Sequence, residues 1–232
     1  MIKPMRRESS TVVSVVGEVR DALLAELARS PNVAVVRPPG TADGAGEDDE
    51  LEPAVRALRQ ATGKSSSYVL VPADPLAAVA AQWRAMWDLS HGPQGSAGFE
   101  ARAAEAVAAW RTGRFELPDY YLVVAPARGE GAGRDAPDAG GAAAGGPAAE
   151  GTGPDLYLGP LRAARPRRVA VALAPPVEQQ EPPRAGPVLD ALRELRHGPW
   201  WPPLDELIDT ARRFFPGGLA EGPGSLAPPR AS

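Results

Sequence analysis

The segment Ser10–Pro38 reads STVVSVVGEVRDALLAELARSPNVAVVRP. Two short runs within it, residues 12–16 and 33–36, are rich in valine and almost uninterrupted by polar residues. Runs of this kind are typical of strands that are buried on both faces of a sheet. The stretch between them is long enough for a helix. The segment therefore predicts a strand, a helix and a second strand.

The stretch between the valine runs has the apolar spacing of an amphipathic helix. Val19, Leu23 and Leu27 recur at every fourth position, which places them on one side of a helix. Ser30 and Pro31 then end this helix, because proline lacks the amide that a further helical turn needs. A helix between two strands predicts that the strands are parallel and that the crossover is right-handed.

The rest of the chain continues the alternation of strands and helices. Further strands are predicted at 66–71, 120–124 and 167–174, with a short strand at 155–158 beside the fourth, and helices at 51–62, 75–91, 96–112, 188–196 and 204–215. The predicted fold is a three-layer α/β domain with a mainly parallel sheet of about five strands and disordered insertions. Its architecture is broadly Rossmann- or flavodoxin-like.

Four segments lack the large apolar residues that a core requires. They are predicted to be a flexible arm (1–9), a disordered loop (128–154), a proline-rich linker (175–187) and a disordered tail (217–232). A flexible loop adds little closure entropy as it lengthens, so the loop at 128–154 fits inside one domain. Residues 10–216 are therefore predicted to form a single α/β domain.

The composition excludes several kinds of chemistry. The 232-residue chain has no cysteine, which excludes disulfides, thiol nucleophiles and thiolate metal sites. Its net charge is −4, and arginine far outnumbers lysine among its 25 basic residues, a bias typical of a high-GC bacterial genome. We expect a cytoplasmic location and no membrane span, because no apolar run reaches the length of a signal peptide or a spanning helix.

Three residues are candidates for binding a small molecule, because they follow strands of the predicted parallel sheet. Gly17 and Glu18 follow the first strand, and Asp74 follows the third. Ligands of open α/β sheets bind outside the carboxyl ends of the strands. The alternative for Asp74 is a structural role. It precedes Pro75 and is predicted to be the N-cap of a helix that begins there.

Three further motifs that resemble functional sites are interpreted as helix ends. Gly63-Lys64-Ser65 matches the end of a phosphate-binding P-loop, but it follows a helix and lacks the motif's first glycine. Gly63 is instead predicted to end the helix in a left-handed conformation. His91 and His197 each precede Gly-Pro at a predicted helix end. We expect no catalytic residue, no metal and no cofactor.

Two groups of residues are candidates for a surface that binds a partner. Trp200 and Trp201 are flanked by prolines, and a rigid turn can present large aromatic side chains to a protein. The alternative is that they pack between the last two helices. The densest basic cluster is Arg162, Arg165, Arg167 and Arg168. The chain is acidic overall and has no nucleic-acid-binding motif, so we expect a protein partner and no nucleic acid.

The sequence favours a non-enzymatic interaction or regulatory module over an enzyme, because the turns are poor in glycine and no catalytic constellation is present. The alternative is a protein or enzyme that binds a nucleotide or another phosphorylated small molecule in the loops at the carboxyl ends of the parallel strands. An α/β architecture hosts many unrelated functions, so the fold alone does not distinguish an interaction module from a protein that binds a small molecule.

We predict that deleting residues 131–153 leaves the fold intact, because this stretch has almost no large apolar side chain that could anchor it to a core. Thermal unfolding of the shortened chain measures the effect. A fall in the unfolding midpoint of more than about 5 °C, which corresponds to roughly 1 kcal/mol or somewhat more for a domain of this length, would show that the loop packs.

Overall fold

The computed structural model describes residues 10–17, 19–38, 51–87, 92–126, 155–174 and 185–214. The arm, the loop at 128–154, most of the linker and the tail, all predicted from the sequence, lie outside these residues. Glu18 also lies outside them.

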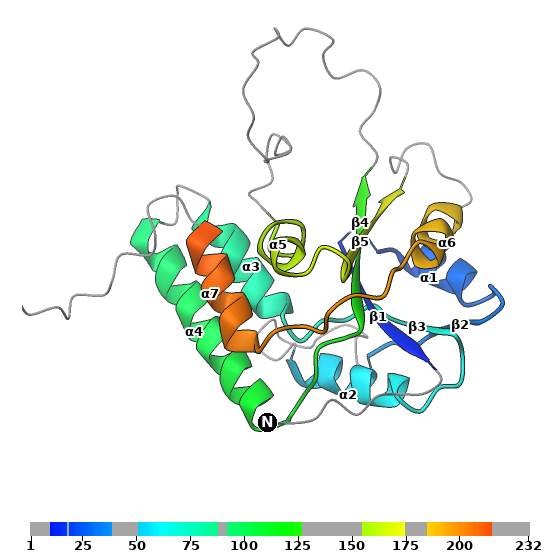
Figure 1. Cartoon of the computed structure of the whole chain (residues 1–232), viewed down its shortest axis with the longest axis horizontal. Coiled ribbons are helices and arrows are strands. Elements are labelled where there is room, and N and C mark those ends of the chain that lie inside the picture. The colour runs from blue at the N-terminus through cyan, green and yellow to red at the C-terminus, as the bar shows by residue number, and fades with distance from the viewer. Residues whose placement is uncertain are drawn as a thin grey trace, which may run out of the picture.

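Five parallel strands form one sheet in the order β2-β3-β1-β4-β5 (Figure 1). The strands are β1 (Thr11–Gly17), β2 (Val33–Val35), β3 (Tyr68–Val71), β4 (Tyr120–Pro126) and β5 (Val169–Ala174). All five strands lie where the apolar runs predicted them. The sheet is entirely parallel, so the predicted βαβ unit at the start of the chain is confirmed.

Helices cover both faces of the sheet, as Figure 1 shows with α1 and α6 on one side and α3, α4 and α7 on the other. The helical elements are α1 (Asp21–Leu27), α2 (Leu51–Ala61), α3 (Ala77–Met86), α4 (Gly92–Arg111), the π-helix η2 (Tyr157–Leu161), α5 (Arg162–Ala164), α6 (Gly186–Arg193) and α7 (Leu204–Phe214). The predicted three-layer α/β fold is confirmed.

Alternate residues of each strand face opposite helical layers. On β4, Leu122 and Val124 pack in one core with α1 and α6, whereas Tyr121 and Val123 pack in the other core with α3, α4 and α7. Both sets are buried, which explains why the strand sequences are continuously apolar instead of alternating. Each fully buried side chain of this size contributes about 1.5–3 kcal/mol to folding.

The direction of each crossover decides which face its helix covers. The connection from β1 to β2 runs one way along the sheet, and those from β2 to β3 and from β3 to β4 run the other way. Right-handed crossovers then require α1 on the face opposite to α2, α3 and α4, and the packing places them so. Relative to the Rossmann order 3-2-1-4-5, β2 and β3 are exchanged.

Among the local predictions that were wrong, two concern residues 155–158 and Gly63. Residues 155–158 form a turn and the start of η2 instead of a short strand, because the Asp155 carboxylate accepts hydrogen bonds from the amides of Tyr157 (2.7 Å) and Leu158 (3.1 Å). These bonds satisfy amides at a helix start and favour a helical turn. Gly63 does not adopt a left-handed conformation. Its amide instead donates to the carbonyl oxygen of Gln60 (3.2 Å), which closes α2 with a tight turn.

Gly17 is required where β1 ends beside β4. Its φ is +96°, a left-handed conformation that favours glycine. A Cβ at this position would lie 2.4 Å from the carbonyl oxygen of Val124, its register partner on β4. The close approach of two central strands therefore explains this glycine.

We predict that Gly17→Ala lowers the free energy of unfolding by more than Gly113→Ala does. Gly113, at the end of α4, also has a positive φ (+71°), but a Cβ there would have no atom within 4 Å. Each substitution introduces strain of about 1–3 kcal/mol, and only Gly17→Ala adds a clash with backbone. Denaturant titration compares the two variants. Equal losses would show that β4 does not constrain this position.

Candidate functional site

Asp74 lies past the carboxyl end of β3, as expected, but it is not the N-cap of the next helix. Helix α3 begins at Ala77, and Leu76 occupies the N-cap position without a side-chain hydrogen bond. The backbone carbonyl of Asp74 accepts from the amide of Ala77 (3.1 Å), while its carboxylate points into the protein interior. The predicted helix start was wrong, because tyrosine hydroxyls bind the carboxylate that was expected to cap the helix.

Asp74, Tyr121 and Tyr157 form a buried polar group that we call the Asp74 cluster. The Tyr121 hydroxyl donates to Oδ1 of Asp74 (2.8 Å), and the Tyr157 hydroxyl donates to Oδ2. The two rings lie 5.2 Å apart between their centroids. A buried carboxylate is costly unless donors replace its water, so these bonds fix the positions of β4 and η2 around the loop after β3.

The environment of the Asp74 cluster keeps both phenols protonated. Burial raises the pKa of Tyr121 and Tyr157 well above the usual value of 10. The nearby Asp74 carboxylate raises the pKa of both further, because a phenolate beside it would repel it. The two tyrosines therefore act as hydrogen-bond donors and not as proton acceptors at neutral pH.

A buried serine holds the loop that carries Asp74. Ser14 lies in the middle of β1, and its hydroxyl donates to the carbonyl oxygen of Ala73 (2.6 Å). This bond ties the chain after β3 to β1 and directs Asp74 towards the two tyrosines. Of the three residues predicted to bind a small molecule, Gly17 and Asp74 are thus in structural contacts, and Glu18 lies outside the described residues.

Arg168 is the only buried member of the predicted basic cluster. Its guanidinium lies over the rings of Tyr120 (5.1 Å) and Trp200 (4.7 Å). Such cation–π contacts are favourable when the cation is shielded from water. It also donates hydrogen bonds to the carbonyl oxygens of Asp119 (2.9 Å), Gly198 (2.9 Å) and Pro199 (3.0 Å). Arg168 therefore has a structural role and is not presented to a partner.

The segment between α6 and α7, residues 194–203, is held by arginines, and we call it the strap. Arg165 donates from Nε to the carbonyl oxygen of Trp200 (2.6 Å), and Arg167 makes a longer bond to that of His197 (3.4 Å). With Arg168, these side chains bind the carbonyls of four consecutive strap residues, 197–200. Arg162 lies exposed on α5.

The two neighbouring tryptophans have different environments. Trp201 is only 5% exposed, meets the ring of Tyr121 edge-on at 5.6 Å, and donates from its indole to the carbonyl oxygen of Pro118 (2.7 Å). It packs in the core with α7, which was the alternative to a surface role. Trp200 is 39% exposed and remains available at the surface.

Strand β5 forms one edge of the sheet and leaves a row of backbone groups unused. The amide of Tyr121 donates to the carbonyl oxygen of Arg168 (2.8 Å), so alternate residues from Arg168 onward point their backbone groups at β4. The intervening residues Val169, Val171 and Leu173 point theirs outward, and no hydrogen bond among the described residues uses these groups. We call these outward groups and their side chains the β5 edge.

Three large apolar side chains are exposed in the described part of the chain, and two of them lie beside β5. The three are Leu173 (59% exposed), Trp200 (39%) and Phe214 (41%). Leu173 belongs to the β5 edge, and Trp200 lies over Arg168, the residue before β5. Sheet edges in natural proteins are usually protected by charge, proline or shortness. Strand β5 has six residues and no charge, whereas the opposite edge strand, β2, has only three residues.

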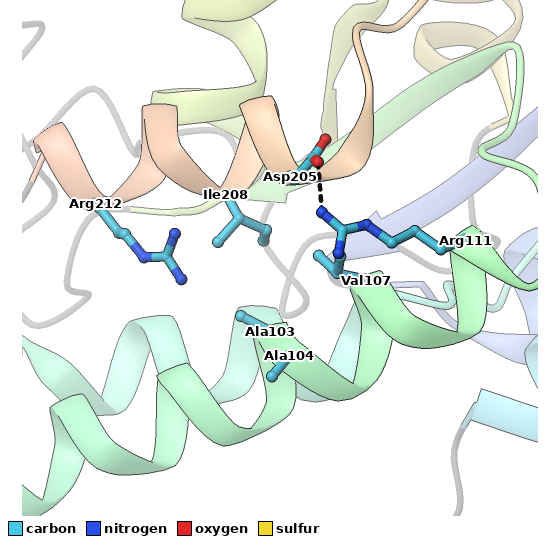
Figure 2. A pocket seen from close by; sticks show the side chains of 7 residues that line it. All are labelled: Ala103, Ala104, Val107, Arg111, Asp205, Ile208 and Arg212. Carbon is cyan, nitrogen blue, oxygen red and sulfur yellow. Dashed lines mark hydrogen bonds and ion pairs between the residues drawn. The ribbon is translucent and has the colours of Figure 1, made fainter. Parts of the chain in front are cut away.

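A groove of about 180 Å³ lies between α4 and α7. Its lining includes Ala103, Val107 and Ile208, and an ion pair between Arg111 and Asp205 (2.8 Å) spans the two helices (Figure 2). Arg212 also lines the groove and binds Glu100 (2.6 Å) and Asp209. Because carboxylates already bind both arginines, the groove offers little unbalanced charge to a ligand.

The described part of the chain contains neither a cluster of metal-ligating side chains nor a helix that could span a membrane. No group of three or more His, Asp or Glu side chains there is placed to hold a metal ion. None of its helices is both long and apolar enough to cross a membrane.

Comparison with known proteins finds no counterpart for this chain. No protein-family model matches it, and no curated protein or solved structure matches it. The function therefore has to be argued from the residues themselves.

The residues that matter at these sites are only weakly indicated by local sequence patterns. Ser14 interrupts a valine run, and a lone polar residue in a buried strand signals a buried hydrogen bond. Tyr121 and Tyr157 showed no such signal, because their shared partner Asp74 is 47 and 83 positions away in the chain. The β5 edge depends on the strand order, which local patterns do not fix.

We predict that Tyr157→Phe lowers the free energy of unfolding by about 1–3 kcal/mol at pH 7, because it removes a hydrogen-bond donor from a buried carboxylate oxygen. Tyr68→Phe is the control. No hydrogen bond of the Tyr68 hydroxyl is seen among the described residues, so we expect a change within about 0.5 kcal/mol. Denaturant titration measures both. Similar losses in the two variants would contradict a special role of the Asp74 cluster.

The same pair of variants tests the effect of alkaline pH. The raised phenol pKa values give stability that is fully present below pH 10 and is lost as the pH rises, because the unfolded chain then releases protons that the folded protein retains. The loss of stability above pH 10 should be shallower in Tyr157→Phe than in the wild type or Tyr68→Phe. Identical slopes would show that Tyr157 ionises normally in the folded protein.

Proposed function

We propose that this protein is a non-enzymatic interaction module that binds an extended segment of a protein partner at the β5 edge. The observation that carries the proposal is the row of outward backbone groups at Val169, Val171 and Leu173, beside the most exposed large apolar side chain in the described part of the chain. An exposed sheet edge binds extended segments by adding a strand, with main-chain hydrogen bonds providing affinity.

The character of β5 defines the kind of segment that fits. From Val169 to Ala174 the strand contains only valine, alanine and leucine, so the edge offers no charged side chain. The side chains of Val169, Val171 and Leu173 lie on the face that packs against η2 and α7, because Val169 belongs to that core. The segment that fits is therefore uncharged, extended and apolar at alternate positions.

The alternative function, binding of a nucleotide or phosphorylated small molecule, has less support from the described contacts. Both carboxylate oxygens of Asp74 accept hydrogen bonds from tyrosines, and Gly17 is explained by the approach of β4. A phosphate site would need amides directed at an anion and a cation near the carboxyl ends of the strands. The arginines at 165, 167 and 168 instead bind the strap at the opposite, amino-terminal end of β5.

We predict that a displayed library of random peptides, selected on the immobilised protein at low density, yields uncharged segments rich in β-branched residues. Leu173→Lys should abolish this enrichment, because it places a charge on the β5 edge. Phe214→Lys is the matched control. It changes another exposed apolar residue, on α7, and should leave the enrichment unchanged.

A thermal-shift screen of nucleotides, dinucleotides and sugar phosphates provides the opposing test. A ligand that binds only the folded state at about a hundred times its dissociation constant adds about 2.7 kcal/mol, which would raise the unfolding midpoint by several degrees. We expect no shift. A clear rise with any of these compounds, together with no peptide enrichment, would replace the interaction module by the small-molecule function.

A further inference from the structure

We infer that the partner of the β5 edge is a second copy of this chain, with the two β5 strands paired antiparallel around a two-fold axis at Val171. The inference rests on the proposed function, since it assigns the occupant of the same edge. Two five-stranded sheets would then join into one continuous sheet.

The spacing of the outward groups fits this symmetry. They belong to residues 169, 171 and 173, a set that is symmetric about Val171. In a two-fold antiparallel pair centred there, Val171 lies opposite its own copy, and Leu173 lies opposite Val169 of the other chain. All three residues then form hydrogen-bonded pairs, which exchange both amide and carbonyl bonds. A register centred at Ala172 would leave Val169 without a partner inside the strand.

The side chains are also compatible with this pairing. Directly opposite residues of an antiparallel pair project to the same face, so Leu173, which is 59% exposed, would pack against the half-buried Val171 of the other copy, beside Val169, which is already buried in its own core. No charged residue lies between 169 and 174, so no like charges oppose each other along the paired strands. A charged partner would gain nothing from this edge, whereas a copy of β5 matches its uncharged, apolar character.

The strap limits how far the pairing extends and agrees with the same register. It is bound through Arg168, the residue immediately before β5. With the axis at Val171, Arg168 lies opposite Ala174, which is the last residue of β5 in the other copy. The paired part of β5 therefore ends next to Arg168, the residue that binds the strap.

The first test is the mass of the protein in solution, measured by sedimentation equilibrium over about a hundredfold range of chain concentration. We expect a dimer of twice the 24.2 kDa chain mass that dissociates on dilution. Leu173→Lys should raise the dissociation constant at least about tenfold, whereas Phe214→Lys should not change it. Circular dichroism and the thermal midpoint show whether each variant is folded.

The second test reads the register and uses the fact that the chain has no cysteine. With the axis at Val171, the Cα atoms of the two copies of this residue lie about 5.5 Å apart, within the range of about 4.4–6.8 Å that a disulfide requires. Val171→Cys should therefore cross-link to a covalent dimer under mild oxidation. In Leu173→Cys the two cysteines would be roughly 14 Å apart, so that variant should not cross-link.

The results of these experiments distinguish a failure of the dimer inference from a failure of the proposed function. A wild-type chain that is monomeric at every concentration overturns the inference, and peptide enrichment that depends on Leu173 would still support the interaction module. A dimer that Leu173→Lys does not weaken, or that Val171→Cys does not cross-link, also overturns the inference, because the copies then meet elsewhere or in another register.

Discussion

The hydrogen bonding of the Asp74 carboxylate is the constraint on which much of this structure depends. Moving a carboxylate from water into a protein interior costs several kcal/mol, and donors must recover that free energy. Tyr121 and Tyr157 supply them from β4 and from η2, so one side chain joins three distant parts of the chain. Because η2 packs in the same core as α7, the position of the last helix also depends on this group.

The buried contacts of Asp74 bear on where in the fold a functional site lies. The carboxyl ends of parallel strands are the usual place for a ligand in an α/β protein. Here the described residues at those ends serve close packing and buried hydrogen bonds. Strand β5, which is uncharged and carries the exposed Leu173, lies instead at the side of the sheet. The proposed binding of an extended segment therefore uses a different part of the fold from the usual ligand site.

Local patterns predicted the strands, the helices and the three layers well, because an apolar run such as 12–16 is buried wherever the sheet places it. They failed where a side chain bonds to a residue that is distant in the sequence instead of to its neighbours. Asp74 was predicted to cap a helix and instead binds two tyrosines, and Trp200 and Trp201 are neighbours with opposite environments because Tyr121 and Arg168 bind them differently. Strand order, and with it the identity of the edge strands, is a property of long-range pairing that no local pattern contains.

The three arginines that bind the strap, Arg165, Arg167 and Arg168, differ from those paired with carboxylates elsewhere in the chain. Their hydrogen-bond acceptors are neutral carbonyl groups of residues 197–200, so added salt screens these bonds far less than it would screen pairs of opposite charges. Lysine could not replace Arg168, because a single ammonium lacks the planar set of donors that reaches three carbonyls at once. Since α6 and α7 lie on opposite faces of the sheet, these guanidinium groups hold the segment that connects the two outer layers, and we expect the two layers to unfold together.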